Sequence, residues 1–374
     1  MRQSMTRFAV MSLLLLSSTL ALHGADKRLL AYYEFDDQTN IPPYNATNIP
    51  YHELTHIIHS NILPSPKADG TLEIPDGFLE PRLISRAHRA GVKVEVCVAG
   101  DANVFAKIVG DPDLREIFAA NLQAFVQKHG YDGVDIDWEV PEDHKQAVNF
   151  TAFLQDLRAL LPAPQYLLSA AVSSSPGSWG IYDFAGMTPV LDFYNVMTYD
   201  FHGPWTNHSG HNSPLFLSPE DPGQCGSLRR SIDNYLTKFD VPAEKLNIGT
   251  AFYGYKFLVA NLWDHCECSG EAFSMTYAQV KPHIGKGWTR YVDPLASAPY
   301  LVHNTKPGFI TYDDQDSTSR KAEYVIKTRD LGGIFMWEIS QDYDGHSQEL
   351  MTALYRAFKH AGGFHRTYRA SPLE

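Results

Sequence analysis

The chain carries the stretch Tyr131-Asp132-Gly133-Val134-Asp135-Ile136-Asp137-Trp138-Glu139. Its apolar residues alternate with carboxylates, which is the period of a β-strand, whose successive side chains point to opposite faces. The carboxylates Asp135, Asp137 and Glu139 therefore share one face of the strand. We predict that this face points into a barrel while the apolar face packs against helices.

Three carboxylates on one face of a strand repel one another when they are ionised. They must share protons, which raises the pKa of at least one of them. Buried unpaired charges also destabilise a fold strongly, so folding alone does not select this arrangement. A solvated strand end and a cation site are the alternatives, and the flanking apolar residues favour a catalytic site.

Further β-rich runs surround this strand along the chain. They lie at Leu29–Phe35, Thr55–Leu63, Val92–Val98, Tyr166–Ser173, Phe193–Tyr199, Leu246–Phe252 and Gly333–Ile339. Helical apolar patterns occur at Asp111–His129, Glu142–Leu161, Ser227–Phe239, Ser317–Leu331 and Gln348–Ala361. Eight strands that alternate with helices predict an α/β fold, a (β/α)8 TIM barrel, with its chemistry at the C-terminal ends of the strands.

The composition of the chain excludes some classes of protein and some classes of binding partner. The chain has 374 residues, of which 44% are apolar and 20% charged, and this excludes a disordered or collagen-like protein. The net charge of −12 repels a phosphate backbone, so we expect no nucleic-acid partner. Aromatic residues make up 12% of the chain, which is a weak indication of carbohydrate binding because aromatic faces stack on sugar rings.

The N-terminus has the pattern of a secretory signal. Arg2 and Arg7 precede the apolar stretch Phe8–Leu22, which is short for a membrane span. We predict a cleaved signal peptide at residues 1–24 and one catalytic barrel domain at residues 25–374. The mature protein is then expected to be secreted or periplasmic, a monomer, and free of the membrane; a retained signal anchor is the alternative.

Four cysteines bear on the redox state and on metal binding. Cys97 lies in an apolar run and is expected to be a buried free thiol. Cys266 and Cys268 flank one residue and are poorly placed to bridge each other, so either is a candidate partner for Cys225. The spacing matches no zinc pattern, and we predict no metal and no cofactor.

The carboxylate strand resembles the signature of glycoside hydrolase family 18, the chitinases and their relatives. The resemblance covers residues 28 to 362 and continues in further motifs. These are Met197-Thr198-Tyr199-Asp200-Phe201-His202-Gly203-Pro204-Trp205, Gly210–Leu215, Lys245–Gly249, Phe252–Gly254, Phe309–Asp314 and Gly332–Glu338.

The resemblance implies a role for each site residue. Glu139 would be the general acid, Asp137 would orient the substrate's 2-acetamido group, and Asp135 would hold Asp137 and its proton. Tyr199 would hydrogen-bond the acetamido carbonyl, and Asp200 would bind a sugar hydroxyl. The other substrate-binding residues would be Trp337, as the floor under the sugar, together with Tyr32, Met197 and Trp205.

Three positions depart from the family's pattern. Cys97 stands where the third strand usually carries a Ser that supports the innermost Asp, and a thiol is a weaker donor. Asn61 replaces an aromatic residue of the second strand, and Tyr255 stands where we expect Arg. These changes bear on efficiency and on the shape of the subsites more than on the reaction type.

The implied function is that of a secreted retaining glycosidase, which cleaves the β-1,4 bonds of chitin or N-acetylglucosamine oligosaccharides. An endo-β-N-acetylglucosaminidase acting on glycans or peptidoglycan is one alternative, and a non-catalytic chitin-binding lectin is another. Many chitinases of the family carry an inserted subdomain after the seventh strand, and the interval Lys256–Gly308 is short for it. We expect at most a short insertion and a shallow, open groove that releases the chain between cuts.

Overall fold

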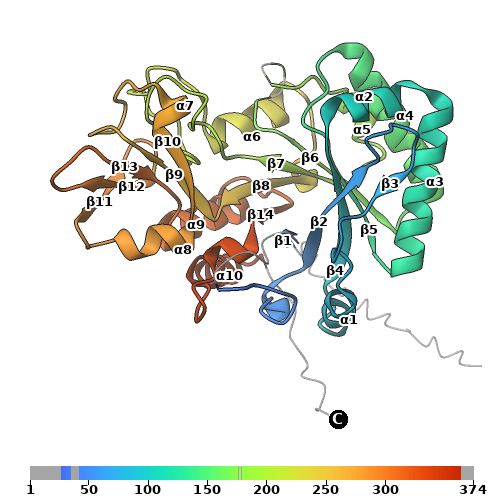
Figure 1. Cartoon of the computed structure of the whole chain (residues 1–374), viewed down its shortest axis with the longest axis horizontal. Coiled ribbons are helices and arrows are strands. Elements are labelled where there is room, and N and C mark those ends of the chain that lie inside the picture. Colours follow the sequence, from blue (N-terminus) through green and yellow to red (C-terminus); the bar gives the residue numbers. More distant parts are fainter. Residues whose placement is uncertain (1–26, 35–41, 176, 178, 364–374) are drawn as a thin grey trace, which may run out of the picture.

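A closed parallel barrel forms the centre of the computed structural model, which describes residues 27–34, 42–175, 177 and 179–363 (Figure 1). Eight strands of the described part pair in parallel, and β1 closes the barrel by pairing with both β2 and β14. They are β1 (Arg28–Glu34), β2 (His56–Pro64), β4 (Lys93–Ala99), β5 (Gly133–Asp137), β6 (Leu167–Ser173), β7 (Phe193–Met197), β8 (Leu246–Ala251) and β14 (Gly333–Trp337). The predicted TIM barrel and its strands are confirmed, whereas the predicted signal peptide lies outside the described residues.

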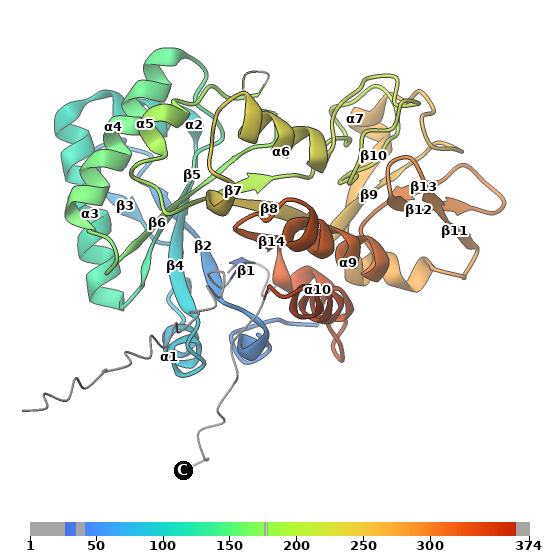
Figure 2. The same ribbon diagram turned by 180° about the vertical axis from the view of Figure 1, so that it is seen from behind.

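Helices surround the barrel, as Figures 1 and 2 show from opposite sides. The five predicted helices are confirmed as α3 (Pro112–His129), α4 (His144–Leu160), α6 (Leu228–Thr237), α9 (Gln315–Glu323) and α10 (Glu349–His360). A π-helical turn, Tyr324–Thr328, continues α9. Helices that the sequence analysis missed are α1 (Pro81–Arg89), α2 (Ala102–Gly110) and α5 (Phe184–Met187), together with 3-10 turns at Tyr51–Glu53, Ala243–Lys245, Lys281–His283 and Ile339–Asp342.

The ends of α3 show why the sequence predicts helices well here. The Asp111 side chain caps the helix by accepting from the backbone N–H groups of Asp113 and Leu114, and Pro112 occupies the first helical position. Gly130 ends the helix with a φ of 80°, which a residue without a Cβ adopts at little cost. Start and stop signals of this kind are local and can be read from the sequence.

A second sheet follows the seventh barrel strand, in the interval where the sequence analysis expected at most a short insertion. Five antiparallel strands form it: β9 (Tyr253–Phe257), β10 (Ala272–Thr276), β11 (Trp288–Asp293), β12 (Ala298–His303) and β13 (Phe309–Thr311). The short helices α7 (Cys268–Glu271) and α8 (Tyr277–Val280) flank β10, and the sheet lies to one side of the barrel (Figure 2). Antiparallel strands need only short turns, so a modest stretch of chain suffices for a whole sheet. A two-stranded extension, β3 (Leu72–Glu73), pairs antiparallel with β2.

The cysteine pairing also differs from the expectation. Cys266 and Cys268 form a disulfide with each other, with their Cα atoms 4.9 Å apart, because the chain turns into α7 at this point. Cys225 and the buried Cys97 are free thiols, so the expected pairing of Cys225 with either of the others was wrong. Cys97 is a free, buried thiol as predicted.

Two hydrophobic clusters make up the core. The larger one lies between the barrel and its helices and includes Val134, Ile136 and Trp138 of the carboxylate strand. The smaller one fills the barrel and continues to the second sheet, and it includes Tyr32 and Tyr199. The alternation of the carboxylate strand thus has the predicted sense, with its apolar side chains toward the helices. None of the helices in the described part combines the length and the apolar character that crossing a lipid bilayer requires.

A buried ion pair fastens α9 to the end of β13. The Lys321 ammonium group, 1% exposed, contacts the Asp313 carboxylate and donates to Ser213 Oγ at 2.6 Å. We predict that Lys321→Met destabilises the protein by about 3–5 kcal/mol, because the Asp313 charge stays buried without its partner. The change is measured as a shift in the urea unfolding midpoint.

The matched control for this prediction is Lys327→Met. Lys327 pairs with Glu323 at 3.2 Å, but both side chains are about half exposed. Exposed pairs of this kind contribute about 0.5 kcal/mol or less. Equal midpoints for the two variants would contradict the role assigned to Lys321.

Candidate active site

Asp135 lies at the centre of the barrel, where its side chain is fully buried. Its Oδ2 accepts from the Tyr32 hydroxyl at 2.9 Å, and its Oδ1 accepts from Ser169 Oγ at 2.5 Å and from Asn195 Nδ2 at 3.1 Å. Burial raises the pKa of Asp135, while these donors and the Cys97 thiol lower it. The donors favour the ionised form, so they offset part of the effect of burial on the pKa of Asp135.

Cys97 is the neighbour of Asp135 on the adjacent barrel strand. The two residues face each other in the register of β4 and β5, and the thiol hydrogen-bonds to the carboxylate. Burial, followed by the charges of Asp135 and Asp137, raises the pKa of Cys97 well above its usual value. The thiol therefore stays protonated and acts as a donor.

A chain of polar side chains continues from Asp135 toward the other end of the barrel. Asn195 Oδ1 accepts from Asn247 Nδ2 at 2.9 Å, and Asn247 Oδ1 accepts from Arg28 Nε at 2.9 Å. Glu95, also fully buried, is hydrogen-bonded to Ser169 Oγ at 3.0 Å. Burial and the Asp135 charge raise the pKa of Glu95 well above its usual value. Glu95 therefore favours its neutral form beside the Asp135 carboxyl group.

Asp137 lies one strand repeat closer to the cleft and is 8% exposed. Its Oδ1 atom is buried and has no hydrogen-bond partner in the described part of the chain. Burial raises the pKa of Asp137 well above its usual value, and the charges of Glu139 and Asp135 raise it further. Asp137 therefore favours its protonated form and has one carboxyl oxygen without a partner.

Glu139 follows β5 and reaches into the cleft, where its side chain is exposed to solvent. The pocket walls desolvate the carboxyl group enough to raise its pKa, and the charge of Asp200 raises it further. The pocket that holds it has a volume of about 160 Å³. Its lining consists of Asp137, Glu139, Trp179, Met197, Tyr199, Asp200, Tyr253 and Trp337.

Tyr199 crosses the mouth of the barrel beside these carboxyl groups and is 6% exposed. A Cβ at position 249 would lie 2.6 Å from the Tyr199 ring, so only Gly249 leaves room for it. Burial raises the pKa of Tyr199 well above its usual value, and the charge of Asp200 raises it further. Its hydroxyl group therefore stays protonated and can donate a hydrogen bond.

Asp200 is held by the second sheet. Its Oδ1 accepts from the Tyr253 hydroxyl at 2.6 Å and from the Tyr255 hydroxyl at 2.9 Å, both from β9. Burial raises its pKa, whereas the two hydroxyl groups lower it. Tyr255, which stands where we expected Arg, thus acts as a neutral hydrogen-bond donor to this carboxylate. The second sheet also contributes Tyr253 to the pocket lining, so the groove has a wall that the sequence analysis did not predict.

The remaining predicted residues take different positions around the pocket. Met197 and Trp337 line it, at the ends of β7 and β14. Tyr32 is 1% exposed and lies beneath Trp337, with ring centroids 5.2 Å apart, and it is absent from the pocket lining. Trp205, 58% exposed, lines an adjoining cavity of about 500 Å³ that shares Glu139, Tyr199 and Asp200 with the first.

Two lining residues were missed as site residues by the sequence analysis. Trp179 is 46% exposed and lines both cavities from the loop after β6, where no periodic pattern marks it. Tyr253 belongs to a quoted motif, but nothing in the motif showed that it would reach Asp200. A larger hollow of about 880 Å³ lies near α10 and contains none of the stacked carboxylates, so size alone does not locate this site.

Comparison with known proteins places the chain among sequences with the same motifs. The family described as "Glycosyl hydrolases family 18" matches residues 28–342. Chitinase A1 of Niallia circulans is 31% identical over 293 residues, which cover 67% of this chain and 40% of that protein. Probable chitinase 2 of Drosophila melanogaster is 30% identical over 71% of this chain and 59% of its own length. The chain thus spans less than two thirds of either relative.

The fold is shared with solved structures. The Group IV chitinase of Ostrinia furnacalis, crystallised in complex with allosamidin, superimposes with a TM-score of 0.81. It is 24% identical in sequence, and the alignment covers 90% of this chain and all of that one. A likeness at this level of identity concerns the fold.

The Cys97 thiol offers a graded test of the electrostatics around Asp135. We predict that the pKa of Asp135 increases in the order Cys97→Ser, the unaltered protein and Cys97→Ala, because hydroxyl, thiol and methyl groups are progressively poorer donors to a carboxylate. The pKa is measured by carboxyl-carbon NMR titration of each protein. Equal pKa values of Asp135 in the three proteins would mean that Cys97 only fills space.

Proposed function

Because the chain belongs to family 18 of the glycosyl hydrolases, we propose that it is a retaining glycosidase that hydrolyses the β-1,4 bonds of chitin or N-acetylglucosamine oligosaccharides. One observation carries the proposal: a row of carboxyl groups runs from the barrel centre into a pocket. In that pocket Asp137 and Glu139 stand beside Tyr199, Asp200 and Trp337.

Glu139 is the general acid in this mechanism. Its raised pKa keeps the carboxyl group protonated closer to neutral pH than an ordinary Glu. It donates this proton to the glycosidic oxygen as the bond to the anomeric carbon breaks. The resulting carboxylate then takes a proton from the water that completes hydrolysis, which restores the acid form.

The substrate supplies the nucleophile. The carbonyl oxygen of the 2-acetamido group attacks the anomeric carbon and forms a cyclic oxazolinium ion, which water opens with net retention of configuration. Asp137 has a buried oxygen without a partner that can accept from the acetamido N–H. Tyr199 keeps its hydroxyl proton and can donate to the acetamido oxygen.

Asp135 acts through Asp137. A charge held in the barrel by Tyr32, Ser169 and Asn195 keeps the proton on Asp137 in the resting protein. When positive charge develops on the oxazolinium ion, Asp137 can pass its proton to the Asp135 carboxylate and stabilise the ion with the charge it gains. Asp135 is therefore a positioning residue, and its neighbours set the charge that Asp137 experiences.

Aromatic faces supply the sugar-binding surface. Trp337 forms the floor of the pocket, and the exposed rings of Trp179 and Trp205 extend this surface into the adjoining cavity. Flat apolar rings pack against the C–H faces of pyranose rings while the hydroxyl groups stay hydrated. The presence of Glu139 in the pocket with a raised pKa favours catalysis over the lectin alternative.

The proposal includes the context in which the enzyme works. The residue pattern at 1–24 is that of a signal peptide, so we propose export to a secreted or periplasmic location. Residues 25–374 then act as one monomeric catalytic domain without a cofactor in the reaction. We also propose that the enzyme releases the polymer chain after each cut.

Glu139→Gln is the central test, with chitin oligosaccharides as substrate and product masses as the readout. We expect kcat to fall by about 100- to 10,000-fold while oligosaccharide binding persists, because glutamine keeps the shape but has no proton to donate. Substrates with a free amine in place of the acetamido group should react far more slowly.

The matched control is Glu142→Gln, because Glu142 is an exposed carboxyl group outside the pocket lining. It should keep the activity of the unaltered protein. Comparable activity in Glu139→Gln, or a product of inverted configuration, would refute the mechanism. Cleavage of N-glycans with no cleavage of chitin oligosaccharides would favour the endo-β-N-acetylglucosaminidase alternative.

The pH profile of the reaction tests the electrostatic interaction between Asp200 and Glu139. The negative charge of Asp200 adds to the desolvation that raises the pKa of Glu139. Asp200→Asn removes that charge, so the pKa of Glu139 falls and the alkaline limb of kcat/KM moves to lower pH. The limb is located from rates across the pH range, whatever the absolute rate, and a limb that stays in place or moves upward would contradict the assignment.

A further inference from the structure

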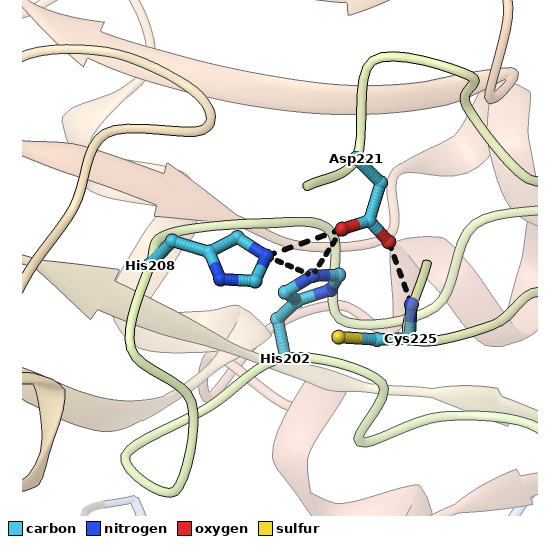
Figure 3. A group of neighbouring side chains, drawn as sticks. All are labelled: His202, His208, Asp221 and Cys225. Carbon is cyan, nitrogen blue, oxygen red and sulfur yellow. Dashed lines mark hydrogen bonds and ion pairs between the residues drawn. The ribbon is translucent and has the colours of Figure 1, made fainter. Parts of the chain in front are cut away.

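Four side chains with metal-binding atoms converge beside the cleft, on the chain that follows β7 (Figure 3). They are His202, His208, Asp221 and Cys225, and one ligand atom of each lies within 4.8 Å of the others. The two histidine Nε2 atoms are 3.2 Å apart. Asp221 Oδ1 lies 3.4 Å from the first of them and 3.1 Å from the second.

The hydrogen bonds of the two rings determine where their lone pairs point. His202 Nδ1 contacts the carbonyl oxygen of His211 at 3.0 Å, and His208 Nδ1 contacts Asn207 Oδ1 at 2.8 Å. Both partners can only accept, so each Nδ1 carries the ring proton. In the neutral rings both Nε2 atoms then present lone pairs to each other and to Asp221, and such an arrangement requires a positive centre among them.

The spacing of these atoms matches that of ligands around one ion. Tetrahedral zinc binds nitrogen and oxygen at about 2.0–2.1 Å, which places neighbouring ligand atoms about 3.3–3.4 Å apart. The contacts of 3.1 to 3.4 Å among His202, His208 and Asp221 lie close to this value. Magnesium and calcium prefer ligand sets made of oxygen, whereas imidazole and thiolate together favour zinc.

We propose that His202 Nε2, His208 Nε2, Asp221 Oδ1 and Cys225 Sγ bind one zinc ion. The Cys225 thiol loses its proton on binding, and the thiolate completes a tetrahedral set. The sequence analysis found no zinc pattern because the spacing of Cys266 and Cys268 matches none. The ligands come instead from two stretches of one long loop, neither of which carries a spaced pair of cysteines.

The surroundings support a built site. The side chains of His202 and Asp221 are 1% and 2% exposed. Asp221 is oriented by two backbone donors, Gly223 N–H to Oδ1 and Cys225 N–H to Oδ2, both at 2.9 Å. A Cβ at Gly223 would lie 2.8 Å from Cys225 Sγ and 2.8 Å from His208 Cε1, so the loop leaves space only for glycine. Supporting hydrogen bonds of this kind are typical of metal ligands.

A proton on His202 is the competing arrangement. Burial lowers the pKa of His202, but its hydrogen bonds to Asp221 and Cys225 raise it to about 9. A single proton on His202 Nε2 has two acceptors to share, His208 Nε2 at 3.2 Å and Asp221 Oδ1 at 3.4 Å, and it cannot bond fully to both. Zinc accounts for the convergence of all four groups.

The site would fasten a wall of the cleft. A zinc ion there ties His202 and His208 to the segment Asp221–Cys225, and Cys225 also lines the cavity that contains Glu139 and Trp205. Asp200 lies two residues before His202, and its backbone N–H donates to Asn212 within the same loop. The ion would therefore act on the stability of this wall, and it takes no part in the glycosidase reaction.

The test uses the purified full chain after removal of bound metal with a chelator. We expect calorimetric titration with zinc to give one site per chain and zinc to raise the Tm. Cobalt, which reports on ligand type, should give the intense thiolate-to-metal absorption of a tetrahedral site. Asp221→Asn and His208→Gln should each weaken zinc binding by about 100-fold or more.

Thiol variants separate the proposed ligand from the other free cysteine. Cys225→Ser should abolish the thiolate-to-cobalt absorption, and the matched control Cys97→Ser should keep both the absorption and the zinc affinity. Because Cys225 is only half buried, we expect Cys225→Ser to keep the fold. Circular dichroism of the variant checks this. Absence of zinc binding to the unaltered protein, or equal affinity in Asp221→Asn, would overturn the proposal in favour of the protonated arrangement.

Discussion

A single buried carboxylate organises this protein. Asp135 has no access to solvent, so its charge must be compensated by donors from inside the barrel. The donors come from four different strands: Tyr32 from β1, Cys97 from β4, Ser169 from β6 and Asn195 from β7. These strands meet around one point only when the barrel is closed and each pair is in register. Satisfying Asp135 therefore selects the register of the barrel as well as the charge of the site.

The three carboxyl side chains along β5 lie at different depths and therefore have different chemical environments. Asp135 is buried and fully hydrogen-bonded, Asp137 is buried with an oxygen left without a partner, and Glu139 reaches the cleft. Desolvation raises the pKa of all three, and the donors around Asp135 oppose that rise for the innermost one alone. The fold therefore favours the ionised form most for Asp135 and the protonated form for Asp137, and it places Glu139 at the cleft.

The chain outside the barrel completes the site from the side. The second sheet contributes Tyr253 and Tyr255, whose hydroxyl groups hold Asp200 at the edge of the pocket. The long loop after β7 carries Asp200 and Trp205 and is folded around the cluster of His202, His208, Asp221 and Cys225. Both parts are held by polar contacts between residues far apart in sequence, so the cleft walls depend on tertiary structure more than the barrel strands do.

The sequence by itself determined the eight barrel strands, five of the helices and the inward face of Asp135, Asp137 and Glu139. Those features rest on local periods of two and about 3.6 residues, on caps such as Asp111, and on motifs that stay contiguous in the chain. Only the tertiary structure decided the second antiparallel sheet, the Cys266–Cys268 disulfide, the contact of Tyr255 with Asp200 and the place of Trp179 in the pocket. These depend on how loops without a period return to the barrel, and such long-range contacts leave no regular pattern in the chain.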